Sequence, residues 1–184
     1  MRARSALLSA LFAICSSPGA AWADDGEWHV GVSVGYASLL RSEQPSLDGV
    51  GTALELRYGL HEALDAFVEL QGSGHPEGAL SYGATGGILY VLDVTRFVPS
   101  FGLAAGVVDV VTESCPPTVL EDGSEGPPVS ACGHSLRPSL GVPFSFDYRL
   151  VPELLVGLHG RYAFLLGSPA TSQLYLGAHA GLVF

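Results

Sequence analysis

The chain has 184 residues and a formal net charge of -10, and 48% of its residues are hydrophobic. Its basic residues other than histidine are all arginines and form no polybasic patch, so the charge pattern of nucleic-acid-binding proteins is excluded. A chain of this length suits one domain.

Residues 1–23 have the pattern of a secretory signal peptide. Arg2 and Arg4 precede an apolar run, and Ala21 to Ala23 carry the small residues of a cleavage site. The apolar run is shorter than the roughly 20 residues that a membrane-spanning helix needs. We therefore expect a cleaved signal peptide at 1–23 and one exported domain at 24–184.

The rest of the chain alternates between apolar and small or polar residues with a period of two. This period is typical of β-strands whose two faces meet different surroundings. The pattern predicts eight strands, at residues 27–37, 50–59, 66–73, 80–92, 97–108, 136–148, 153–164 and 175–184.

One face of each expected strand is continuously apolar, and the other carries mostly glycine, serine and isolated charges. A water-soluble barrel would carry abundant charge on its outer face, so the apolar face is better suited to lipid and the other face to a cramped interior. The pattern predicts an all-β fold, an eight-stranded antiparallel up-and-down transmembrane β-barrel with a polar, filled interior. Aromatic residues near the ends of the apolar face fit interfacial girdles: Trp28, Tyr36, Tyr58, Tyr82, Tyr90, Tyr148 and Tyr162.

The lengths of the connections give the barrel a direction. The expected connections after strands two, four and six are short, and those after strands one and five are long. The connection after strand seven is intermediate, and the one after strand three is brief. Because small outer-membrane barrels have short periplasmic turns and longer external loops, we expect both mature termini on the periplasmic side.

Cys115 and Cys132 bracket the acidic, Pro/Gly-rich segment between strands five and six. In an exported chain this pair predicts one disulfide that closes a surface loop. A metal or redox role would favour closer spacing, such as Cys-x-x-Cys. The acidic loop itself suits either a solvated segment or one that attracts cations.

The signal peptide, the eight alternating strands, the loop asymmetry and the final strand ending in Phe184 resemble the small outer-membrane barrels of the OmpA/OmpX type. The resemblance implies an outer-membrane location among lipids and lipopolysaccharide. It also implies that the barrel-assembly machinery reads the last strand, with Leu182 and Phe184 as its signal. We expect a monomer.

The inward faces of the expected strands hold a set of charged residues. If strands two and three turn about residues 61–63, Glu55 lies opposite Glu69, and an arginine from the facing wall is needed between them. An interior only wide enough for side chains favours a structural salt-bridge plug, with a gated ion path as the alternative. The expected network contains Glu55, Arg57, Glu69, Arg137, Asp147 and Arg161.

Three histidines form a second candidate group. A hairpin centred near Pro169 would set His159 opposite His179, with His29 on the neighbouring first strand. Three imidazoles suit a zinc site or acid/base chemistry, but polar filling of the interior is the favoured interpretation, so we predict no cofactor. His75 and His134 fall in external loops with no evident partner.

Three functions remain open. The narrow interior favours a non-enzymatic structural or surface-interaction role, with a gated ion or small-solute channel as the alternative. The third is an enzyme resembling the lipid A deacylases and palmitoyltransferases that share the small-barrel form. Such enzymes need a serine beside a base, and the sequence has no His-x-Ser arrangement to match.

Overall fold

The computed structural model describes residues 26–41, 45–92, 96–111, 133–167 and 171–184. The signal peptide expected at 1–23 and the cysteines Cys115 and Cys132 lie outside these ranges, so both expectations stay predictions. In the described ranges, no helix has the length and apolarity that crossing a membrane demands.

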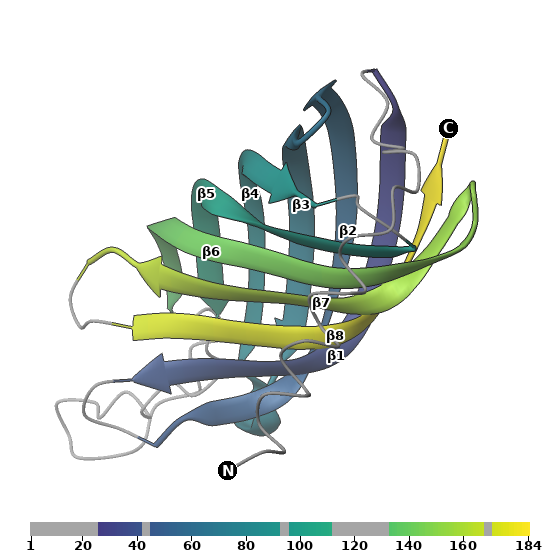
Figure 1. Cartoon of the computed structure of the whole chain (residues 1–184). Helices are drawn as coiled ribbons and strands as arrows, with labels where there is room; N and C mark the ends of the chain where they lie inside the picture. Colours follow the sequence, from purple (N-terminus) through teal and green to yellow (C-terminus); the bar gives the residue numbers. More distant parts are fainter. Residues whose placement is uncertain (1–25, 42–44, 93–95, 112–132, 168–170) are drawn as a thin grey trace, which may run out of the picture.

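The eight predicted strands are confirmed, and they form one closed barrel in which every neighbouring pair is antiparallel (Figure 1). Several strands run beyond their predicted ends, chiefly on the side away from the chain's C-terminus. A 3-10 helix, η1, covers Pro76–Gly78. The strands are β1 Trp28–Arg41, β2 Leu47–His61, β3 Leu64–Gly74, β4 Leu80–Val91, β5 Phe97–Val111, β6 His134–Val151, β7 Leu154–Leu165 and β8 Thr171–Val183.

The first and last strands close the barrel. β1 and β8 pair from His29 and Val183 to Arg41 and Thr171. Beyond the ladder, the amide of Trp28 donates to the carbonyl of Phe184 at 2.8 Å, and the amide of Phe184 donates back at 2.9 Å. Because each strand has two neighbours, no row of backbone amides and carbonyls faces the exterior unpaired, as a hydrocarbon environment demands.

The two faces of the sheet have the polarity that the sequence predicts. Leu103 and Val32, on the outer face, are 73% and 56% exposed, whereas Ser33, beside Val32 on β1, is 7% exposed. Aromatic rings meet on the outer face near both ends. Trp28 and Tyr58 lie 4.8 Å apart beside the C-terminus, and Tyr162 and Phe164 lie 4.9 Å apart toward the other end. The exterior is therefore an apolar belt with an aromatic girdle at each end.

The connection between β1 and β2 is shorter than predicted. It covers residues 42–46, because Ser38 and Leu39 stay in β1 and pair with Asp48 and Leu47. The carboxylate of Asp48 accepts hydrogen bonds from Tyr36 at 2.6 Å and from Ser38 at 2.8 Å. The expectation of a long loop after strand one is wrong, since these bonds extend the hairpin. The long connection follows β5.

Two apolar clusters occupy opposite ends of the interior. The cluster beside the C-terminus holds Phe67, Leu89, Val91, Val98, Ala104, Leu155 and Val183. The cluster at the other end holds Leu39, Val108 and Leu165, with Leu47 and Val110 packed against it. Glu55, Glu69 and Arg161 lie on stretches of strand between them. Arg57 and Asp147 instead pair with Phe67 and Val98 of the first cluster, and Arg137 pairs with Val108 of the second. The interior therefore has an apolar cluster toward each end, with charged and polar side chains both between and beside the clusters.

A single outward arginine tests whether the exterior meets lipid. Leu103 lies in the middle of β5, and we expect L103R to lower the free energy of unfolding by about 2–4 kcal/mol in lipid vesicles. L136R, nearer the end of β6, is the matched control, because arginine costs about 0–1 kcal/mol near an interface. Equilibrium urea unfolding of the vesicle-inserted protein gives both values. Equal values for the two variants would contradict a lipid-facing belt.

Candidate functional site

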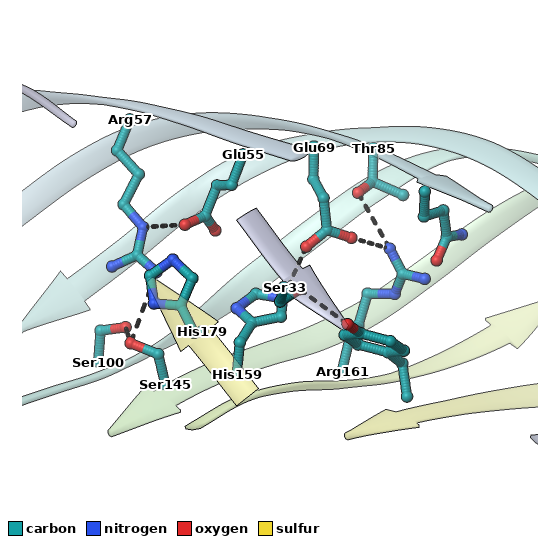
Figure 2. A network of polar contacts seen from close by, with 12 residues as sticks. Ser33, Glu55, Arg57, Glu69, Thr85, Ser100, Ser145, His159, Arg161 and His179 are labelled. Carbon is teal, nitrogen blue, oxygen red and sulfur yellow. Dashed lines mark hydrogen bonds and ion pairs between the residues drawn. The ribbon is translucent and has the colours of Figure 1, made fainter. Parts of the chain in front are cut away.

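A group of charged and polar side chains fills the middle of the barrel. We call it the lumen cluster. Its members are 0 to 7% exposed, so water has almost no access to them. Figure 2 shows its core, with side chains from facing strands pointing toward one another. The lumen cluster consists of His29, Glu55, Arg57, Glu69, Asp147, His159, Arg161 and His179.

One half of the lumen cluster joins β2, β6 and β8. The Nε of Arg57 donates to Oε1 of Glu55 at 2.5 Å, and its Nη2 reaches the hydroxyl of Ser145 at 3.5 Å. Ser145 donates to Oδ2 of Asp147 at 2.8 Å. The other oxygen of Asp147 lies 2.8 Å from Nδ1 of His179. One arginine and two carboxylates are thus tied into a single hydrogen-bonded group.

The other half centres on Glu69 of β3. Arg161 of β7 donates from Nη1 to Oε1 of Glu69, and Nε2 of His159 lies 2.7 Å from Oε2 of the same carboxylate. Arg161 also contacts Thr85 at 3.4 Å and Gln173 at 3.3 Å. Figure 2 shows Glu69 between His159 and Arg161. A carboxylate and a guanidinium on opposite walls therefore meet across the lumen.

The predicted pairing of the carboxylates is confirmed. Glu55 stands directly opposite Glu69 in the β2–β3 ladder, and Arg161 is the arginine from the facing wall. Arg137, the other arginine predicted for this place, does not take it. It lies toward the far end of β6, opposite Val108, and donates to Ser135 at 2.8 Å and Thr171 at 3.2 Å.

The three predicted histidines gather, but in a different register. His159 stands opposite Gly177, and His179 stands opposite Gly157. The predicted pairing of His159 with His179 is therefore wrong by two residues. The rings of His159 and His179 are 5.9 Å apart, and those of His29 and His179 are 5.5 Å apart. Among the described residues, the group that brings three possible metal-ligand atoms within 4.8 Å of one another is instead Glu55, Glu69 and His159.

Two glycines make room for the histidine rings. A Cβ atom at Gly31 would lie 2.2 Å from Nε2 of His179, and one at Gly181 would lie 2.0 Å from Nε2 of His29. Neither distance is sterically possible. The glycines at these positions of β1 and β8 therefore leave the space that the imidazole rings occupy.

Several polar atoms of the lumen cluster have no hydrogen-bond partner among the described residues. They include Oε2 of Glu55, Oε2 of Glu69 and both ring nitrogens of His159. The 2.7 Å contact between Glu69 and His159 is short enough for a hydrogen bond but is not aligned for one. Unpaired polar atoms in a buried site are costly.

Sequence reasoning missed a second polar chain. His75 bonds Ser73 at 2.9 Å, Ser73 bonds Ser81 at 2.6 Å, and Gln173 donates to Ser81 at 3.1 Å. The signal was the spacing of Ser73 and His75, two residues apart and hence on one face. His134 also has a partner, since its Nδ1 lies 2.8 Å from Asp109. The expectation that His75 and His134 lack partners is wrong.

No model of a known protein family matches the sequence, and no curated protein matches it. Solved structures do match the fold. Neisserial surface protein A shares 15% identity at a TM-score of 0.68, over 86% of this chain and 99% of its own. The chain has the fold of the small outer-membrane barrels.

Two further barrels support the same fold. Ail, the attachment invasion locus protein of Yersinia pestis, shares 12% identity at a TM-score of 0.54, over 88% of this chain and 100% of its own. The outer membrane protein OprG from Pseudomonas aeruginosa shares 12% identity at a TM-score of 0.53, over 87% and 96%. At these identities the likeness concerns the outer-membrane barrel fold alone.

The Glu69–Arg161 pair gives a stability prediction. We expect R161M to lower the free energy of unfolding by about 3–5 kcal/mol, because it leaves the Glu69 carboxylate buried without its guanidinium. The double variant E69Q/R161M should recover part of this loss, since the unpaired charge is then gone. Urea unfolding in lipid vesicles gives the values. A double variant less stable than R161M would show that the pair is not the source of the effect.

His75 gives a prediction about pH. Burial lowers the pKa of its imidazole below the ordinary value of 6.5. Below that pH the unfolded chain binds a proton that the folded barrel does not, so the free energy of unfolding falls as the pH falls. We expect H75Q to lose less stability than the wild type on acidification. The measurement is urea unfolding at about pH 7 and about pH 5.

The control for this measurement is H61Q, which replaces an exposed histidine at the end of β2. We expect H61Q to keep the pH dependence of the wild type. An H75Q variant that lost as much stability as the wild type would contradict the role given to the buried imidazole.

Proposed function

We propose that the chain is a non-enzymatic outer-membrane barrel with a structural or surface-interaction role. The observation that carries this proposal is the filled interior. In a water-filled pore the lumen side chains would be accessible, whereas Asp147 is 0% exposed and Glu69 and Arg161 are each 1% exposed. The apolar clusters at both ends add to the barrier. A lumen of this kind holds the barrel rigid and leaves its outer surface and loops for function.

The proposed orientation puts both ends of the mature chain in the periplasm. The connections β2–β3 and β6–β7 at the end beside the C-terminus are tight, at residues 62–63 and 152–153. The long connection, residues 112–133, leaves from the opposite end. This asymmetry supports an external position for the acidic segment and its predicted disulfide between Cys115 and Cys132.

The last strand supports the proposed contacts with lipid and with the barrel-assembly machinery. Leu182 and Phe184 point outward, at 56% and 71% exposed, on the same face as the rest of the apolar belt. Membrane lipids and lipopolysaccharide are the partners that such a belt suits. Because the strand-pairing of the sheet is already complete in one chain, a monomer is the proposed state.

The surface-interaction role draws further support from the proteins that share the fold. One is called a surface protein, and another is called an attachment invasion locus protein. In this chain a rigid barrel presents a long connection at one end, which is the arrangement in which loops commonly bind partners. The net negative charge favours a partner or counter-ion of positive charge.

The hydrogen-bonded serine and histidine pair in the described part of the chain does not support lipid hydrolysis. Ser73 and its partner His75 are 9% and 7% exposed, and both belong to the inward polar chain that continues to Ser81. A lipid substrate approaches from the exterior, where these side chains are not available. The pair is therefore better explained as part of the packing of the interior.

Recording in planar lipid bilayers tests the proposal. We expect the purified mature protein to show no discrete conductance steps, because buried ion pairs and two apolar clusters block the lumen. E55Q should behave in the same way, since it leaves both apolar clusters in place. Discrete steps in the wild type that change in E55Q would favour the channel. Recovery of the mature protein in the soluble periplasmic fraction would contradict the proposed location.

A further inference from the structure

The lumen cluster carries an unbalanced charge. Its carboxylates are Glu55, Glu69 and Asp147, and its guanidiniums are Arg57 and Arg161. With neutral imidazoles, one negative charge is left in a site that water scarcely reaches. A buried charge of this kind is costly unless a proton or a bound cation compensates it.

The two glutamates are each held by an arginine through one oxygen only. Arg57 binds Oε1 of Glu55, and Arg161 binds Oε1 of Glu69. Among the described residues, Oε2 of Glu55 has no hydrogen-bond partner, and Oε2 of Glu69 has only the unaligned 2.7 Å contact with Nε2 of His159. This is the arrangement in which outer partners orient a carboxylate and leave its other oxygen available to a metal ion.

His159 supplies a third donor atom at the same place. Its ring lies between the two glutamates in Figure 2, and both of its nitrogens lack a hydrogen-bond partner in the described part of the chain. The ligand atoms that Glu55, Glu69 and His159 offer lie within 4.8 Å of one another, and all three residues are buried. One imidazole and two carboxylates are a donor set that suits zinc and similar divalent transition metals.

We propose that Glu55, Glu69 and His159 bind one divalent transition-metal ion, such as Zn²⁺, inside the barrel. Ligand atoms around a tetrahedral zinc ion are roughly 3.3 Å apart, so small side-chain rotations bring these three to coordination distance. The divalent ion changes the net charge of the lumen cluster from -1 to +1, and it uses the unpaired oxygens and imidazole nitrogen. It links β2 and β3 to β7 on the facing wall.

The apolar clusters at both ends of the lumen determine when the ion enters. Phe67 and Leu89 pack toward one end and Leu39 and Val108 toward the other, and apolar side chains of this kind are a poor environment for a hydrated ion on its way to the lumen cluster. The ion is therefore taken up while the barrel closes. The site is loaded by refolding the chain with metal, and refolding without metal is the control.

The experiment uses the mature chain refolded into detergent in the presence of ZnCl₂, with free metal then removed by gel filtration in chelator-treated buffer. Elemental analysis by mass spectrometry measures the zinc that stays bound. We expect about one zinc ion per wild-type chain and at least a tenfold lower content in H159Q. Heat-modifiable migration on gels shows that each variant has formed the barrel.

H134Q is the matched control, because His134 is 71% exposed at the end of β6 and pairs with Asp109, away from the lumen cluster. It should keep the full zinc content. A wild-type barrel without bound zinc would overturn the proposal and assign the missing charge to a proton on an imidazole. Equal loss of zinc in H134Q and H159Q would overturn it as well.

Zinc-edge X-ray absorption on the loaded wild type keeps the test decisive if H159Q does not fold. We expect a shell of nitrogen and oxygen neighbours at about 2.0–2.1 Å that includes one imidazole. A spectrum with no imidazole would overturn the proposal, since it would place the ion outside the group that contains His159.

Discussion

A barrel of eight strands encloses a space about as wide as the side chains that fill it. Every feature of the interior follows from this limit. Where a large ring such as that of His179 enters, the strand beside it must have no side chain, as at Gly31. Where a long side chain such as Arg161 crosses the lumen, it meets the opposite wall and must find a partner there. The interior is therefore a packed core made of polar groups, enclosed by an apolar shell.

Charged groups in such a core are stable only when they are paired or hydrogen-bonded. Surrounded by hydrocarbon outside and by apolar clusters toward both ends, the carboxylates and guanidiniums meet little water, so their hydrogen bonds replace hydration. Arg57 binds one oxygen of Glu55 and reaches toward Asp147 through Ser145. The same arrangement leaves particular atoms of Glu55, Glu69 and His159 without partners, and it is these atoms that set the lumen cluster apart from a simple salt-bridge plug.

The fold was open to prediction because a period of two along the chain, with glycine and serine on one face and large apolar residues on the other, has few physical solutions. The predicted opposition of Glu55 and Glu69 holds because two offsets cancel. The turn pairs His61 with Leu64, one residue away from the predicted pairing, and a bulge between Gly59 and His61 shifts the ladder back by one residue. The residues opposite His159 and His179 were not predictable, because moving the centre of the turn by one residue changes the residue opposite each position by two.

Side-chain contacts across the lumen could not be predicted from the sequence for another reason. Whether Arg137 or Arg161 reaches Glu69 depends on how far the strands are staggered around the barrel, and no local pattern records that stagger. The hydrogen bonds that extend β1 and β2 past Ser38 and Asp48 were missed because serine and aspartate commonly mark loops. In this hairpin the carboxylate of Asp48 accepts hydrogen bonds from the neighbouring strand, so the strands continue past it.

The bridge between Glu69 and Arg161 also bears on the order of folding. These residues are 92 positions apart in the chain, and they meet only after β7 has come to face β3. Until then both side chains need water, so a half-formed barrel must keep its future interior hydrated. Expulsion of that water therefore accompanies the approach of β7 to β3.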